Sequence, residues 1–118
     1  MMAMDPKQYI KVMSNWQEQF VASTKLEVFG MTDADLASIS VPTVVIPGND
    51  QTHASVNGRL AASRIPGCVL HQLPIQDQEV PLINYTEWAP YEDEIARTFL
   101  ELMRKADAQR SKGQAAAS

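Results

Sequence analysis

The segment that most constrains this chain is a short β-branched run, Thr43–Ile46, bounded by Pro42 and Pro47. Branched side chains favour extended backbone because they pack well on a pleated surface. The run does not alternate between apolar and polar residues, so we expect a strand that is covered on both faces, as in a parallel sheet. Parallel neighbours are joined by a crossover, usually a helix, and the run therefore predicts a βαβ unit.

The residues that follow supply the rest of that unit. Ser55–Ile65 has the composition of a helix, and Pro66-Gly67 marks its end, although Asn57-Gly58 weakens the pattern. Cys68–Leu73 then predicts a second strand, parallel to the first. Leu26–Phe29 is a candidate for a short third strand.

Two long helices are expected at the ends of the chain. The first covers Asp5–Ser23, with Asp5 as N-cap and Pro6 at the first helical position. Its apolar residues recur every three or four positions and predict a stripe packed in the core: Ile10, Met13, Trp16 and Phe20. The last helix covers Tyr91–Ala106, with acidic residues in its first turn.

Shorter features connect these elements. Thr32 or Asp33 can cap a short helix that ends at Ala37. The connection Pro74–Pro90 is long for a compact domain, and such loops are usually functional or poorly ordered. We expect a single α/β domain over residues 1–107 and a disordered tail over residues 108–118.

Composition excludes several classes of protein. Apolar residues make up 45% of the 118 residues and charged residues 20%, which is typical of a globular domain. The net charge of −4 argues against nucleic acid and anionic membrane as partners. No apolar run reaches the roughly 20 residues of a membrane helix, and no signal peptide is evident. The single cysteine, Cys68, has no internal disulfide partner, and we expect a cytoplasmic protein.

Four phrases of the sequence resemble the C-terminal part of the α/β-hydrolase superfamily. The segment 41–50, VPTVVIPGND, resembles the strand that delivers the catalytic acid, and LASI at 36–39 resembles its entry. IPGCVL at 65–70 resembles the lead into the final strand, and the last helix, with Ile95, Phe99 and Leu100, resembles the closing helix. The resemblance implies an α/β fold and relatives that hydrolyse small ester or acyl substrates.

By this resemblance, Asp50 occupies the position of the triad acid that orients a catalytic histidine. A carboxylate at the carboxyl end of a parallel strand also lies where open α/β sheets bind ligands, and Gly48 permits a sharp turn there. The alternative is structural, because Asp50 can instead cap the Ser55 helix or close a turn with neighbouring amides. The sequence leaves both interpretations open.

The other groups of a hydrolase triad are missing. No glycine of the chain flanks a serine, cysteine or aspartate as in the G-x-S-x-G nucleophile elbow. The family's histidine should follow Leu73-Pro74, but no histidine occurs downstream. A triad needs all three groups to converge, so we expect the chain to be catalytically inactive alone.

The remaining titratable residues have structural explanations. His53 is a weak catalytic candidate that can bond to Asp50, although a surface position is the plainer expectation. We expect His71 to be buried and bonded to a backbone carbonyl, and Cys68 to be a small core residue. Asp50, His53 and His71 do not match a zinc spacing, and we expect no metal and no cofactor.

Two functions of different kinds follow from the sequence. The chain is either an inactive, hydrolase-like C-terminal fragment or a non-catalytic module that self-associates or completes another sheet. Two or three strands leave the edge of the first strand unpaired, and such an edge favours pairing with another chain. We therefore expect a homodimer with Val44, Ile46 and the N-terminal helix at or beside the interface.

Overall fold

The computed structural model describes residues 4–26, 28 and 30–117. In chain order the elements are α1 (Pro6–Ser23), α2 (Asp33–Ala37), β1 (Val44–Val45), α3 (Ser55–Arg64), β2 (Val69–Leu70), the 3₁₀ turns η1 (Tyr85–Glu87) and η2 (Ala89–Tyr91), and α4 (Glu92–Ala117). Among these, no helix is both long enough and apolar enough to cross a membrane.

The predicted βαβ unit is present. β1 and β2 form a two-stranded parallel sheet in which Val44 lies opposite Val69 and Val45 opposite Leu70. The amide of Val69 donates to the carbonyl of Thr43, and that of His71 to the carbonyl of Val45, each at 3.0 Å. α3 connects the strands, and its bounds agree with the prediction to within one residue. The strands are shorter than expected.

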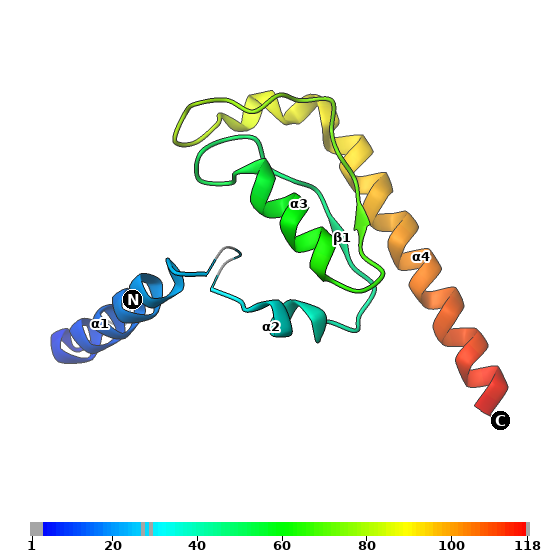
Figure 1. The fold of residues 1–118 in the computed structure, drawn as a ribbon, viewed down its shortest axis with the longest axis horizontal. Helices are drawn as coiled ribbons and strands as arrows, with labels where there is room; N and C mark the ends of the chain where they lie inside the picture. The colour runs from blue at the N-terminus through cyan, green and yellow to red at the C-terminus, as the bar shows by residue number, and fades with distance from the viewer. Residues whose placement is uncertain (1–3, 27, 29, 118) are drawn as a thin grey trace.

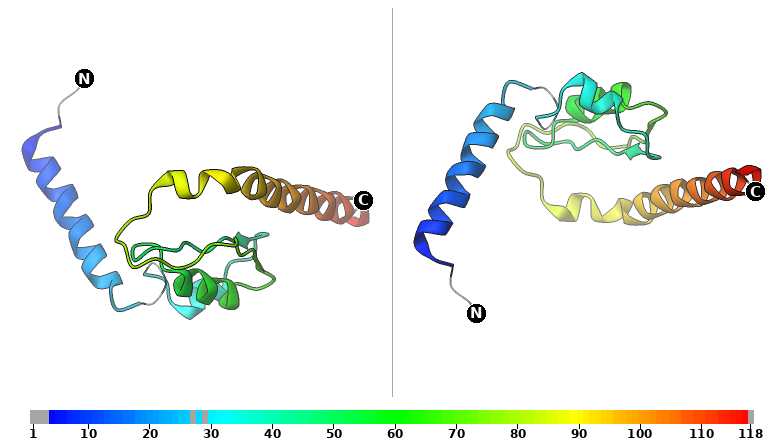
Figure 2. Two further views of the ribbon diagram at one scale, coloured as in Figure 1. Left: turned by 90° about the horizontal axis from the view of Figure 1, so that it is seen from above. Right: turned by 90° about the horizontal axis from the view of Figure 1, so that it is seen from below.

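The elements lie in three layers. Figure 2 shows α2 and α3 on one face of the sheet and η1, η2 and the start of α4 on the other. α3 packs against both strands and against α2. His71, just beyond β2, bonds through Nε2 to Oε1 of Glu94 in α4 at 2.8 Å, which joins the sheet to the outer layer.

The hydrophobic core is small and lies at the α2–α3 side of the sheet. Its buried members are Val28, Leu36, Ala61 and Ile65, with Cys68 packed against them. The expectation that both faces of the first strand are covered is wrong, because Val44, Val45 and Ile46 are half-buried. Both residues of β2 are exposed.

α1 begins as predicted, with Asp5 as N-cap and Pro6 in its first turn. However, the expected core position of Trp16 is wrong. Its side chain is 61% exposed, and none of the residues of α1 is buried. Figure 1 gives the reason: α1 projects from the rest of the molecule, so its apolar stripe has no surface of its own chain to pack on.

α4 is longer than the sequence pattern indicated. It continues through Ala117, so the segment 108–117, expected to be a disordered tail, is helical. Alanine and glutamine have high helix propensity, which extends the helix beyond its last apolar residues. The candidate third strand includes residues 27 and 29, which lie outside the described residues, while Val28 forms an isolated antiparallel bridge with Met31. Thr32 caps α2 through a capping box with Asp35.

Candidate functional site

The candidate acid, Asp50, is buried and begins an exposed turn just beyond the carboxyl end of β1. The turn folds back so closely that a Cβ at Gly48 would overlap the His53 carbonyl oxygen and lie 2.5 Å from the His53 Cβ. Glycine is needed here for close approach of the backbone rather than for an unusual dihedral angle. The prediction of a sharp exit turn at Gly48 is confirmed.

The Asp50 carboxylate has three hydrogen-bond partners. Oδ1 accepts from the backbone N–H of His53 at 2.7 Å and lies 3.0 Å from the His53 Nδ1. Oδ2 accepts from the backbone N–H of Ile83 at 2.9 Å. Asp50 is 5% exposed. The Ile83 bond, ahead of the bonds from His53, holds the pKa of Asp50 below its ordinary value of 3.8, against the opposing effect of burial.

These contacts show whether Asp50 closes a turn and whether His53 lies at the surface. Asp50 closes a turn with the neighbouring amide of His53, as the structural alternative predicted. His53 is at the surface, with its side chain 55% exposed, and is also bonded to Asp50. The bond from Ile83 carried no sequence signal, because residue 83 lies far along the chain in an irregular connection.

The preceding residue, Asn49, holds the same connection to the turn. Its Nδ2 donates to the Gln76 carbonyl at 3.1 Å, its Oδ1 accepts from Trp88 Nε1 at 2.9 Å, and its carbonyl accepts from the Gln78 amide at 2.8 Å. We call Asn49, Asp50 and their partners in residues 76–88 the loop clamp. It explains why the long connection Pro74–Pro90 is ordered despite its three prolines, Pro74, Pro81 and Pro90.

A large apolar cavity opens beside the Asp50–His53 pair. Its volume is about 650 Å³. Core residues such as Val28, Leu36 and Ile65 line one side, and Leu82, Trp88 and Ile95 line the other. Asp50 and His53 also line the cavity. An apolar cavity with a few polar side chains in its wall is the usual composition of a ligand site.

The other candidate residues lie elsewhere. His71 is half-buried and bonds to the Glu94 carboxylate, so the expected backbone-carbonyl partner is wrong. The cause is α4, whose first turn brings Glu94 beside the end of β2. Cys68 packs against the core as expected, and burial raises the pKa of its thiol. Neither residue lines the cavity.

The chemistry available to the pair is proton transfer. A carboxylate beside Nδ1 favours the tautomer with the proton on Nδ1 and leaves Nε2 as a proton acceptor. Within the described part of the chain, no hydroxyl or thiol is bonded to His53, so the pair has no nucleophile to activate. The same residues include no cluster of three or more His, Cys, Asp or Glu side chains that could hold a metal ion.

The arrangement is therefore a buried carboxylate that is paired with a surface histidine and held by the loop clamp. Comparison of the chain with models of known protein families, with curated proteins and with solved structures finds no match.

Proposed function

We propose that this chain is a hydrolase-like unit that carries the acid position of an α/β-hydrolase and has no hydrolase activity alone. The proposal rests on one observation: Asp50 is a buried, ionised carboxylate at the carboxyl end of a parallel strand, bonded to a histidine at the lining of an apolar cavity. Catalytically complete relatives by this resemblance act on small ester or acyl substrates.

Inactivity is supported by the absence of a nucleophile among the described hydrogen-bond partners of the pair. Its two oxygens bind the amides of His53 and Ile83 and the His53 ring, so the carboxylate is engaged within its own turn and loop. A nucleophile within reach of His53 Nε2 would be needed for acyl transfer. The described residues offer none.

A fluorophosphonate probe tests this proposal. We expect no stoichiometric labelling of the purified chain and no turnover of a nitrophenyl ester above the rate of the Asp50→Asn variant. Stoichiometric labelling of one serine together with ester turnover that Asp50→Asn abolishes would contradict the proposal.

A second function, self-association or completion of another sheet, is supported by the free edge of β1. The carbonyls of Thr43 and Val45 face β2, and backbone groups alternate in direction along a strand, so those of Val44 point to the opposite edge. Among the described residues the sheet has two strands, and that edge has no neighbour. Light scattering tests this function: a mass of twice 13.1 kDa supports self-association, and a mass of 13.1 kDa contradicts it.

A further inference from the structure

α1 is an amphipathic helix, and none of its apolar residues is buried by the described part of the chain. Ile10, Met13, Trp16 and Phe20 are all exposed, and the rings of Trp16 and Phe20 stack with their centroids 5.3 Å apart. Most of the stability of a helix in a protein comes from packing of its apolar face. α1 therefore needs a surface to pack on.

The cavity beside Asp50 is the matching surface. A cavity of roughly 150 Å³ holds one benzene-sized group, so about 650 Å³ has room for about four such groups. Its outer rim is unfinished, because Leu82 is 66% exposed although it lines the cavity. A helix with apolar residues three and four positions apart is the usual occupant of such a groove.

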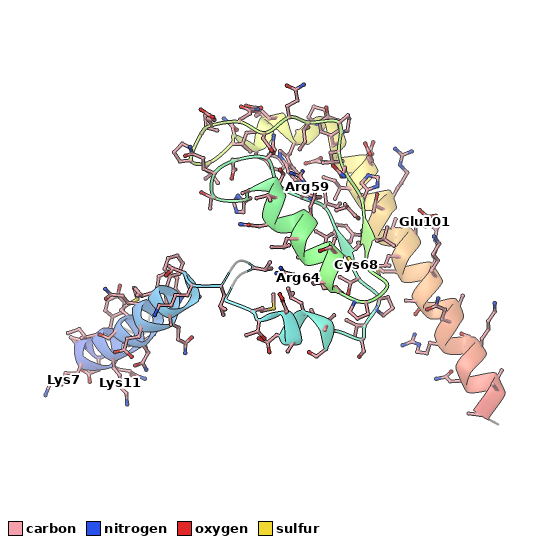
Figure 3. All side chains as sticks on the ribbon, viewed as in Figure 1. Lys7, Lys11, Arg59, Arg64, Cys68 and Glu101 are labelled. Atoms are coloured by element: carbon pink, nitrogen blue, oxygen red, sulfur yellow. The ribbon has the colours of Figure 1, made fainter. Side chains whose placement is uncertain are left out.

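The charges of the two surfaces are complementary. α1 has Lys7 and Lys11 near its N-terminal end, where Figure 3 shows them far from the rest of the molecule. The cavity is bordered by Glu92, which begins α4 together with Asp93 and Glu94. Opposite charges at the rim of an interface favour one orientation and raise the association rate.

The chain cannot place α1 in its own cavity as it is folded. Gly30, with φ +72°, packs against the last turn of α1, where an added Cβ would lie 2.7 Å from the Cβ of Ser23. The Leu26 amide also donates to the Ser23 carbonyl at 3.0 Å. In this arrangement α1 is directed away from the body, as both views of Figure 2 show. The α1 of another molecule is free of this restriction.

The exposed area fits a second copy. The chain exposes 9331 Å², whereas a compact monomer of 13.1 kDa exposes about 6,400 Å². The excess of about 2,900 Å² exceeds the roughly 1,000–2,500 Å² that each chain contributes to an obligate homodimer. Two-fold exchange would fill the Asp50 cavity of both molecules with identical contacts.

From these observations we infer that two copies exchange their α1 helices, each placing Trp16 and Phe20 in the cavity of the other. The inference rests on the second proposed function, self-association, and it assigns the interface to α1 and the cavity instead of the β1 edge. Because α1 then borders the Asp50–His53 pair of the partner molecule, the exchange would also close that pair off from bulk solvent.

Light scattering of charge variants tests the exchange. Trp16→Lys/Phe20→Lys should reduce the mass from twice 13.1 kDa to 13.1 kDa. The matched control, Gln8→Lys/Asn15→Lys, adds the same charge to the opposite face of α1 and should remain dimeric. Leu82→Lys in the cavity rim should also give a monomer, while Val80→Lys in the same loop, outside the cavity lining, should not.

Mixing two monomeric variants tests directly whether α1 of one molecule binds the cavity of the other. A monomeric α1 variant keeps an intact cavity, and a monomeric Leu82→Lys variant keeps an intact α1, so an equimolar mixture should recover a mass of twice 13.1 kDa. A dimer that persists in Trp16→Lys/Phe20→Lys overturns the inference but leaves self-association intact. A dimer that persists in Leu82→Lys overturns it in favour of α1–α1 pairing. A monomeric wild-type chain contradicts both the inference and self-association.

Discussion

Asp50 shows how one carboxylate can accept hydrogen bonds from two backbone amides at once, one local and one distant. Its first oxygen closes a local turn with His53, and its second oxygen binds the amide of Ile83 from a distant connection. Both amides need an acceptor once they are removed from water. The residue resembling a catalytic acid is therefore also the centre of the loop clamp.

Replacement of Asp50 by asparagine should cost more than the loss of a helix cap. The amide group of asparagine would face either the His53 or the Ile83 N–H and leave it without an acceptor. We expect the melting temperature at pH 7 to fall by several degrees, on the order of 5 °C. Asp107→Asn, at an exposed position on α4, is the matched control and should change it little.

The wild-type protein and the Asp50→Asn variant should also differ in how their melting temperatures change with pH. The folded-state pKa of Asp50 lies below 3.8, so its contribution is present above that value and is lost as the pH falls through the folded-state pKa. The difference in melting temperature between wild type and Asp50→Asn should therefore shrink as the pH falls below 3.8. A constant difference from pH 7 to pH 3 would mean that the bonds to the ionised carboxylate do not stabilise the fold.

At the scale of the elements, close packing of α3 on the end of β1 depends on Gly58. An added Cβ at Gly58 would lie 3.0 Å from both the Cα and the Cβ of Pro47, which is buried. Asn57-Gly58 weakened the helix prediction for this segment, yet the helix forms. The contact supplies the reason for glycine: the helix loses propensity but gains a short distance to the sheet.

Alanine substitutions at two helical glycines should have opposite effects. Gly58→Ala should destabilise the protein by about 1 kcal/mol, since the overlap with Pro47 outweighs the gain in helix propensity. Gly113→Ala in α4 meets open space and should be neutral or stabilising by up to about 0.5 kcal/mol. Urea unfolding at one fixed protein concentration measures both. Stabilisation by Gly58→Ala would show that Pro47 can move aside at little cost.

Local patterns predicted the helices and the parallel pairing because caps, periodicity and turn residues act within a few positions. Asp5, Thr32 and Pro66-Gly67 are examples of such signals. Patterns could not show whether a stripe is buried, and for this reason Trp16 was assigned to a core that does not extend to α1. They also could not pair Asp50 with Ile83 or His71 with Glu94, because those contacts depend on where the connection and α4 return to the sheet.

At the scale of the whole molecule, the chain is extended for its length. Its radius of gyration is 18.6 Å, whereas a compact chain of 118 residues has about 13 to 14 Å. α1 and the far half of α4 account for this shape, since both extend beyond the small core (Figure 1). A shape of this kind is expected of a subunit whose remaining contacts come from a second molecule.

Thermal stability should accordingly depend on protein concentration. The proposed dimer would be stabilised by mass action, so a tenfold rise in concentration should raise the melting temperature by a few degrees. Trp16→Lys/Phe20→Lys should remove this dependence, whereas Gln8→Lys/Asn15→Lys should keep it. A wild-type melting temperature that is independent of concentration over two orders of magnitude would contradict the dimer.

The loop clamp also determines the order in which the molecule comes apart. Its bonds join Asn49 and Asp50 to residues 76–88, so forming it closes a loop of some tens of residues, which costs chain entropy. The strands pair across a similar length of chain, but α3 packs on both of them, whereas most residues of the segment 76–88 are exposed. The clamp should thus form late in folding and open first, through a local fluctuation that leaves the β1–α3–β2 unit intact. Each opening would release Ile83 and expose the Asp50 carboxylate, so solvent and solutes would reach this carboxylate intermittently, at a rate set by the motion of the loop.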